Sequence, residues 1–170
     1  MIKPGDRLFG KHTIITDGAP YMTRYWFGRL RLHVFYRGDI DPDCHDHPWD
    51  FWTFPLTSYV EEVIKRREQT FDYGSGAIIH PPLVTYESCL QVVPAFRLSF
   101  RPAAHTHRVL GPYAGFNVER YPVIATGKIV TLVWHSAIKR RWGFLKNRNG
   151  EWCWIAWKNY VFDGGKEGPC

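Results

Sequence analysis

The chain has 170 residues, of which 45% are hydrophobic and 22% charged, and its formal net charge is +6. These values fit a globular protein with one domain, residues 1–170, that encloses a substantial core. No apolar run approaches the roughly 18 residues that span a bilayer, so we expect no membrane partner and a cytoplasmic location.

The basic residues and the cysteines identify no particular partner. Apart from short runs at 65–67 and 139–141, the cations are scattered, as on an ordinary solvated surface. A nucleic-acid partner is therefore not expected, although the charge does not exclude one. The cysteines show neither CxxC spacing nor a dense disulfide pattern, so we expect reduced thiols at Cys44, Cys89, Cys153 and Cys170.

The periodicity along the chain is mostly that of β-strands. A weak helical pattern covers residues 20–26. The first clear strand, 27–36, places apolar residues on one face and Arg29, Arg31 and His33 on the other. Further strands are expected at 51–62, 76–80, 83–87, 96–101, 107–110, 129–135 and 151–157. Residues 112–128 have the composition of a long loop, a kind of segment that often forms a functional lid.

Many short strands separated by turns at roughly ten-residue spacing predict an all-β sandwich or barrel. The aromatic content of 16% fits this class, because aromatic side chains favour pleated, half-buried surfaces. Trp152 and Trp154 alternate along the last expected strand. Such a stripe is typical of core or edge cover, and the alternative is a stacking platform for a base or sugar ring.

The most informative segment contains two histidines separated by one residue, His45 and His47. Side chains at i and i+2 of a strand point to the same face, so both imidazoles can reach one interior point. Imidazole is a common ligand of zinc, iron, nickel and copper. Two ligands do not complete a site, so a third must come from another segment, and 101–108 offers both His105 and His107.

These segments resemble the two motifs of the cupin superfamily, an HxH motif and a later PxGxxH motif. Pro102 to His107 has the second spacing, with Ala104 in the usual glycine position, so the resemblance implies His107 as the third ligand. His45-Asp46-His47-Pro48-Trp49 and His107-Arg108-Val109 are similar to a little-characterised group of bacterial and phage cupins, over about residues 30–160. The resemblance implies a double-stranded β-helix, or jelly-roll barrel, with few short helices.

One position departs from the cupin pattern. The usual acidic ligand lies four residues after the second histidine, and here that residue is Phe51. Asp50 lies one residue earlier and points to the opposite face, unless a bulge shifts the register. The fourth ligand beside His45, His47 and His107 is therefore either Asp50 or water. Glu61 lies too far along the ribbon to be a first choice.

Other polar residues are expected around the metal or its substrate. His33, His105, Arg31 and Arg101 are candidates for hydrogen bonding to the ligands or for holding a substrate. The remaining histidines, at 12, 80 and 135, show no pattern with a partner and are interpreted as structural.

A metal held by three neutral histidines leaves open positions, which is typical of catalytic sites. We expect one divalent ion, iron(II) before zinc or nickel, and an oxygenase-type reaction on a small anionic molecule. The alternative is a non-catalytic cupin-fold module that binds through its basic, aromatic surface. A metal-independent isomerase is a third hypothesis, weakened because the sequence shows no clear His–Asp dyad. A homodimer is also expected from the resemblance.

Overall fold

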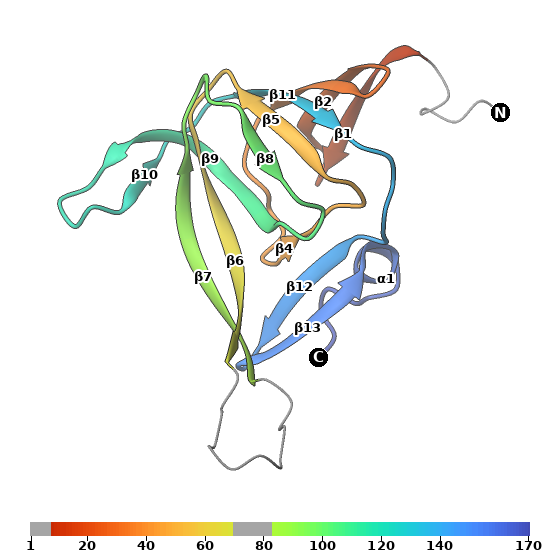
Figure 1. Ribbon diagram of the computed structural model, residues 1–170, viewed down its shortest axis with the longest axis vertical. Coiled ribbons are helices and arrows are strands. Elements are labelled where there is room, and N and C mark those ends of the chain that lie inside the picture. The colour runs from red at the N-terminus through yellow and green to blue at the C-terminus, as the bar shows by residue number, and fades with distance from the viewer. Residues whose placement is uncertain (1–7, 70–82) are drawn as a thin grey trace, which may run out of the picture.

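The computed structural model describes residues 8–69 and 83–170, and these residues form antiparallel strands and one short helix (Figure 1). The first sheet has the order β1 (Phe9–Thr16), β2 (Ala19–Phe27), β3 (Leu30–Phe35), β11 (Ile129–His135), β5 (Phe51–Pro55) and β8 (Ser99–Arg101). The second sheet has the order β13 (Glu151–Ala156), β12 (Gly143–Arg148), β4 (Cys44–His45), β9 (Thr106–Phe116), β6 (Tyr59–Gln69) and β7 (Leu83–Val93). A short strand, β10 (Pro122–Ile124), pairs with β9, and α1 (Trp157–Phe162) follows β13. No helix in these two ranges is long and apolar enough to cross a membrane.

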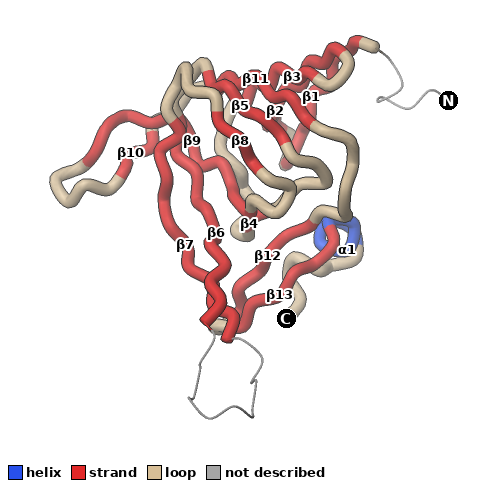
Figure 2. The backbone as a smooth tube through the Cα atoms, viewed as in Figure 1, coloured by secondary structure: helices blue, strands red, loops and turns tan. Residues whose placement is uncertain are grey.

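The strand pairing is nested. β3 pairs with β11, β4 with β9, β5 with β8, and β6 with β7, so the first half of the barrel runs beside the second half in reverse order. The chain also moves between the sheets, because β3 and β5 belong to the first sheet whereas β4 and β6 belong to the second (Figure 2). This arrangement is a double-stranded β-helix of the jelly-roll type, which confirms the expected all-β fold class.

Most predicted strands are found, with changed limits. The predicted strand 51–62 is split into β5 and β6, because the chain crosses between the sheets at 56–58. The strand 96–101 shortens to β8, while 83–87 and 107–110 lie within the longer β7 and β9. The predicted strand 76–80 and His80 lie outside the described residues.

Two expectations about local structure are wrong. Residues 20–26 are not helical, because their backbone pairs on both sides, with β1 and with β3. Residues 112–128 are not a continuous loop, because 112–116 extend β9 and β10 folds back against it. In Figure 1 this β9–β10 hairpin projects from the side of the barrel.

The polar face of β3 points inward. Arg31 and His33 line an internal cavity together with Phe35, whereas the alternate residues of the strand lie on the outer side. The inner surface of the barrel is therefore partly polar. Its apolar part is a buried cluster with members from both sheets: Met22, Phe35, Tyr59, Val93, Val109 and Ile129.

The C-terminal elements are attached to the barrel through β4. β12 pairs with β4 at Cys44 and His45, and the buried carboxylate of Asp43 joins the same elements. Asp43 accepts hydrogen bonds from both Nη atoms of Arg148 (2.9 and 2.8 Å) and from the hydroxyl of Tyr160 (2.9 Å). This network fixes β4, and with it His45, relative to β12 and α1.

The expectation of reduced thiols is wrong for two of the four cysteines. Cys153 and Cys170 form a disulfide, with a Cα–Cα distance of 5.5 Å. The separation of 17 residues in the chain gave no sign of this proximity, which arises because the C-terminal segment returns to β13. Cys44 and Cys89 are free.

We predict that Asp43→Ala lowers the free energy of unfolding by about 2–3 kcal/mol, because it leaves Arg148 and Tyr160 without their acceptor. Chemical denaturation measures the change. Glu68→Ala is the control, since it removes an ion pair with Arg66 that is exposed and costs less than about 1 kcal/mol. Equal effects of the two substitutions would contradict the role given to Asp43.

Candidate metal site and cavity

The structure brings His45, His47 and His107 together, as the sequence predicts. His45 ends β4 and lies directly opposite His107 of β9 in the antiparallel ladder. His47 follows β4, and its backbone N–H donates to the carbonyl of Ala103 at 2.9 Å. One ring nitrogen from each of the three histidines lies within 4.8 Å of the others, so the set could hold one metal ion.

The spacing of these ring nitrogens fits a shared ion. The Nε2 atoms of His47 and His107 are 3.0 Å apart. Two nitrogens bound to one ion at about 2.1 Å, with an angle near 90°, are also about 3 Å apart. The ring of His45 lies at similar distances from both neighbours, with its centroid 5.2 Å from that of His47 and 5.3 Å from that of His107. Little rearrangement is needed to place an ion among them.

A buried carboxylate orients His107. Oε2 of Glu61, on β6, lies 2.8 Å from Nδ1 of His107, and the Glu61 side chain is fully buried. Because a carboxylate accepts hydrogen bonds, Nδ1 of His107 carries the proton and Nε2 presents its lone pair toward His47. Metal-binding histidines in proteins usually have such a partner on their second nitrogen.

The other oxygen of Glu61 is balanced by a buried cation. Oε1 forms an ion pair with Nη2 of Arg101 at 2.8 Å, and Nε2 of His105 lies 3.6 Å away. Burial alone would raise the pKa of Glu61, but hydrogen bonding to His105 and His107 and the charge of Arg101 hold it well below its usual range. Glu61 is therefore ionised. Arg101 and His105 act on this carboxylate, and neither lines the cavity.

Glu61, His105 and His107 also form a second group whose ligand atoms could hold a metal ion. The two groups share His107. The ion pair with Arg101 occupies one carboxylate oxygen of this second group, so the histidine trio is the stronger candidate.

The acidic residues near the HxH motif are held elsewhere. The Asp50 carboxylate accepts from the backbone N–H of Ala103 at 2.7 Å and pairs with Lys139. Asp46 accepts from Trp154 and from the backbone of Gly143. The ring of Phe51, in the position of the usual acidic ligand, packs 4.7 Å from the ring of His47. This arrangement gives no support to Asp50 as a fourth ligand.

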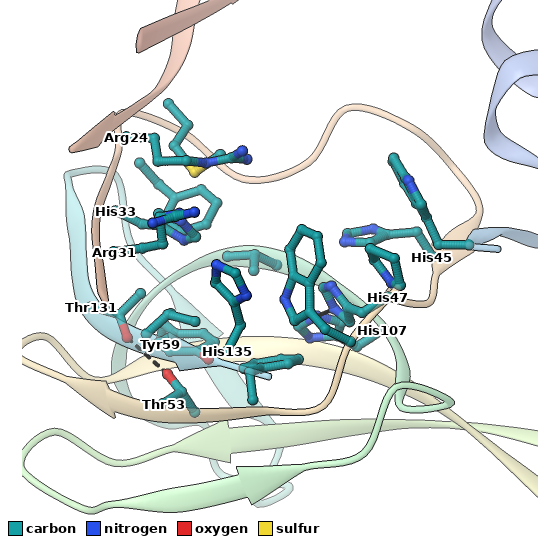
Figure 3. Close-up of a pocket in the computed structure, with 18 of the residues that line it drawn as sticks. Arg24, Arg31, His33, His45, His47, Thr53, Tyr59, His107, Thr131 and His135 are labelled. Carbon is teal, nitrogen blue, oxygen red and sulfur yellow. Dashed lines mark hydrogen bonds between the residues drawn. The ribbon is translucent and has the colours of Figure 1, made fainter. Parts of the chain in front are cut away.

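The three histidines line one end of an internal cavity of about 350 Å³ (Figure 3). This volume lies near the lower limit for sites that bind small molecules. Arg24, Arg31 and His33 lie at the other end, and His135 lies between the two groups. Burial lowers the pKa values of His45, His47, His33 and His135, so these four histidines are neutral.

Three of the polar residues in or beside this site were missed by the sequence reasoning. Arg24 lies in the segment 20–26, for which a helix was expected and which is part of β2. His135 showed no pattern with a partner. Glu61 was judged too distant along the chain. Its own strand did contain a signal, because Glu61 lies between Tyr59 and Val63 on a face that is otherwise apolar and buried.

Comparison with known proteins finds no matching family model and no matching curated protein. Among solved structures, the iron(II) form of HppE is similar over 80% of this chain and 59% of that chain, with 10% identity and a TM-score of 0.42. DMSP lyase DddQ from Ruegeria pomeroyi DSS-3 is similar over 79% of this chain and 50% of that chain, with 17% identity and a TM-score of 0.35. The chain thus spans half to three-fifths of these proteins. The likeness is too distant to assign residues or chemistry, so the site rests on its own geometry.

We predict that the stability of the metal-free protein falls as the pH is lowered from about 6.5 toward 4. Burial lowers the pKa of His33 to about 3 and that of His45 to about 4, whereas both are about 6.5 in the unfolded chain. In this range the unfolded chain binds protons that the folded protein does not. Each of these histidines therefore lowers the free energy of unfolding by up to about 1.4 kcal/mol for each pH unit. Denaturation at several pH values measures the slope.

His33→Gln should reduce this slope by about one proton, and His12→Gln serves as the control because His12 is exposed on β1. An unchanged slope in His33→Gln would show that His33 is not held neutral.

Proposed function

We propose that this protein is a metal-dependent enzyme in which His45, His47 and His107 hold one divalent ion. The observation that carries the proposal is the convergence of three ring nitrogens at one end of a cavity, with the lone pair of His107 oriented by the hydrogen bond to Glu61. Three protein ligands leave positions open, as in catalytic rather than structural sites. The cavity beside these positions has room for a small molecule.

The donor set fits iron(II), zinc and nickel, and we favour iron(II). A divalent ion with three neutral ligands keeps its charge and can act as a Lewis acid or, as iron(II), support oxygenase-type chemistry.

The chain's own residues supply orientation and proton handling. Nδ1 of His135 donates to the carbonyl of Ser136 at 2.8 Å, so its Nε2 is the unprotonated nitrogen. That Nε2 is buried and has no partner among the described residues. A substrate in the cavity could therefore donate a hydrogen bond, or transfer a proton, to Nε2 of His135. Trp49 and Phe51 enclose the region beside His135 and His47 with apolar rings.

A second candidate is a binding module that uses the outer face of the first sheet. Trp134, Trp52 and Phe100 are cross-strand neighbours on β11, β5 and β8, and each is about half exposed. A contiguous exposed aromatic row is typical of a contact surface. This surface lies outside the cavity, so the protein could use both. Metal binding by the three histidines therefore tests the enzyme hypothesis independently of the surface.

We predict about one equivalent of metal in protein purified without an affinity tag and loaded anaerobically with iron(II). His45→Ala and His107→Ala should each lower the metal content at least tenfold, because two imidazoles do not hold the ion. His12→Ala, at an exposed histidine, should leave it unchanged. Elemental analysis provides the measurement.

Full metal retention in both ligand variants would refute the site. If the wild type takes up no metal under any loading, the metal-dependent enzyme is refuted. The remaining hypotheses are then a metal-independent protein that uses His107 and Glu61 as an acid–base pair, and the binding module.

We predict that Glu61→Gln weakens metal binding by about 10- to 100-fold, because the neutral amide no longer enhances the basicity of His107. Glu62→Gln is the matched control, since its carboxylate pairs with Arg108 outside the cavity lining. Titration with a competing chelator measures both affinities. Equal affinities in the two variants would mean that Glu61 does not act through His107.

A further inference from the structure

The end of the cavity opposite the three histidines contains an uncompensated positive charge. Arg24, on β2, lines the cavity, and its Nε is buried without a hydrogen-bond partner. In the part of the chain that the structure describes, no carboxylate pairs with it, and burial lowers its pKa. A buried cation without a counter-ion costs free energy, so proteins rarely retain one unless something binds there.

The neighbours of Arg24 add to this charge. Arg31 also lines the cavity, and its Nη1 donates only to backbone carbonyls, those of Gly28 and Leu30. His33 presents a buried Nε2 that has no partner among the described residues. The charges of both arginines, after burial itself, lower the pKa of His33. Two guanidinium groups and a free imidazole nitrogen thus face one small space with no acidic side chain paired to them.

This arrangement matches the requirements of an anionic group. Guanidinium donors recognise carboxylate-like oxygens by paired hydrogen bonds, and a low-dielectric site strengthens them. We propose that Arg24, Arg31 and His33 form a subsite for the acidic group of a small organic acid. The proposal rests on the proposed function only for the orientation of this ligand. The other end of the same molecule would lie beside His135 and face the metal-binding histidines (Figure 3).

The size of the cavity limits this ligand. A volume of about 350 Å³ that also borders the metal-binding histidines suits a compact acid rather than a nucleotide or a peptide. Apolar side chains, among them Phe35 and Val133, also line the cavity and favour a short hydrocarbon segment between the acidic group and the reacting end.

The test uses full-length protein stripped of metal, and three probes of matched shape: butanoate, propane-1-sulfonate and the neutral butanamide. NMR titration, followed at tryptophan indole and arginine Nε signals, gives each dissociation constant. We expect both anions to bind wild-type protein at least tenfold more tightly than butanamide. Equal binding of anion and amide would overturn the proposal.

Arg24→Gln should weaken butanoate binding at least tenfold and leave butanamide unchanged, and Arg24→Lys should restore part of the affinity. Arg97→Gln is the control, because Arg97 is exposed and does not line the cavity. We also expect Arg24→Gln to raise Tm slightly, since it removes an unpaired and partly buried charge. This result would show that the variant folds. Unchanged butanoate binding in folded Arg24→Gln would contradict the subsite.

The metal content of Arg24→Gln separates the two proposals. Normal metal content together with lost anion binding supports both the metal site and the separate anion subsite. Anion binding by a wild-type protein that never takes up metal would refute the proposed function and leave the subsite standing.

Discussion

The candidate site depends on one buried contact, between the carboxylate of Glu61 and Nδ1 of His107. A fully buried carboxylate is costly unless it is paired, and here Arg101 and His107 compensate it on its two oxygens. The same contact fixes which nitrogen of His107 carries the proton. The position of Glu61 follows from the pairing of β6 with β9, where the register shifts between Val60 and Glu61. The sheet that forms the barrel therefore also orients the proposed metal ligand, His107.

The cavity separates two kinds of polar group. At one end His45 and His47 are neutral, because burial lowers their pKa values, and a neutral imidazole is the form that binds metals. At the other end Arg24 and Arg31 keep a positive charge without an acidic partner. The cavity has nitrogen electron-pair donors at one end and cationic groups at the other. A ligand with an acidic group at one end would therefore bind in one orientation. An acid held at the arginine end would place its far end next to the proposed metal site.

The sequence predicted the parts that depend on local spacing. The HxH pair and the Pro102-to-His107 spacing identified the histidines that the structure brings together, and strand periodicity identified the fold class. The relation of Glu61 to His107 was missed because it depends on a long-range register and a bulge. Arg24 was missed because an apparent helical pattern hid a strand that pairs on both sides. The Cys153–Cys170 bridge depends on the path of the C-terminal segment, which no local pattern encodes.

The most direct test of the central claim is an anomalous-difference map from a crystal of metal-loaded protein, with data collected on both sides of the metal absorption edge. We predict one strong peak within about 2.3 Å of a ring nitrogen of each of His45, His47 and His107. A peak coordinated by other residues, or no peak at this end of the cavity in protein shown to contain metal, would contradict it.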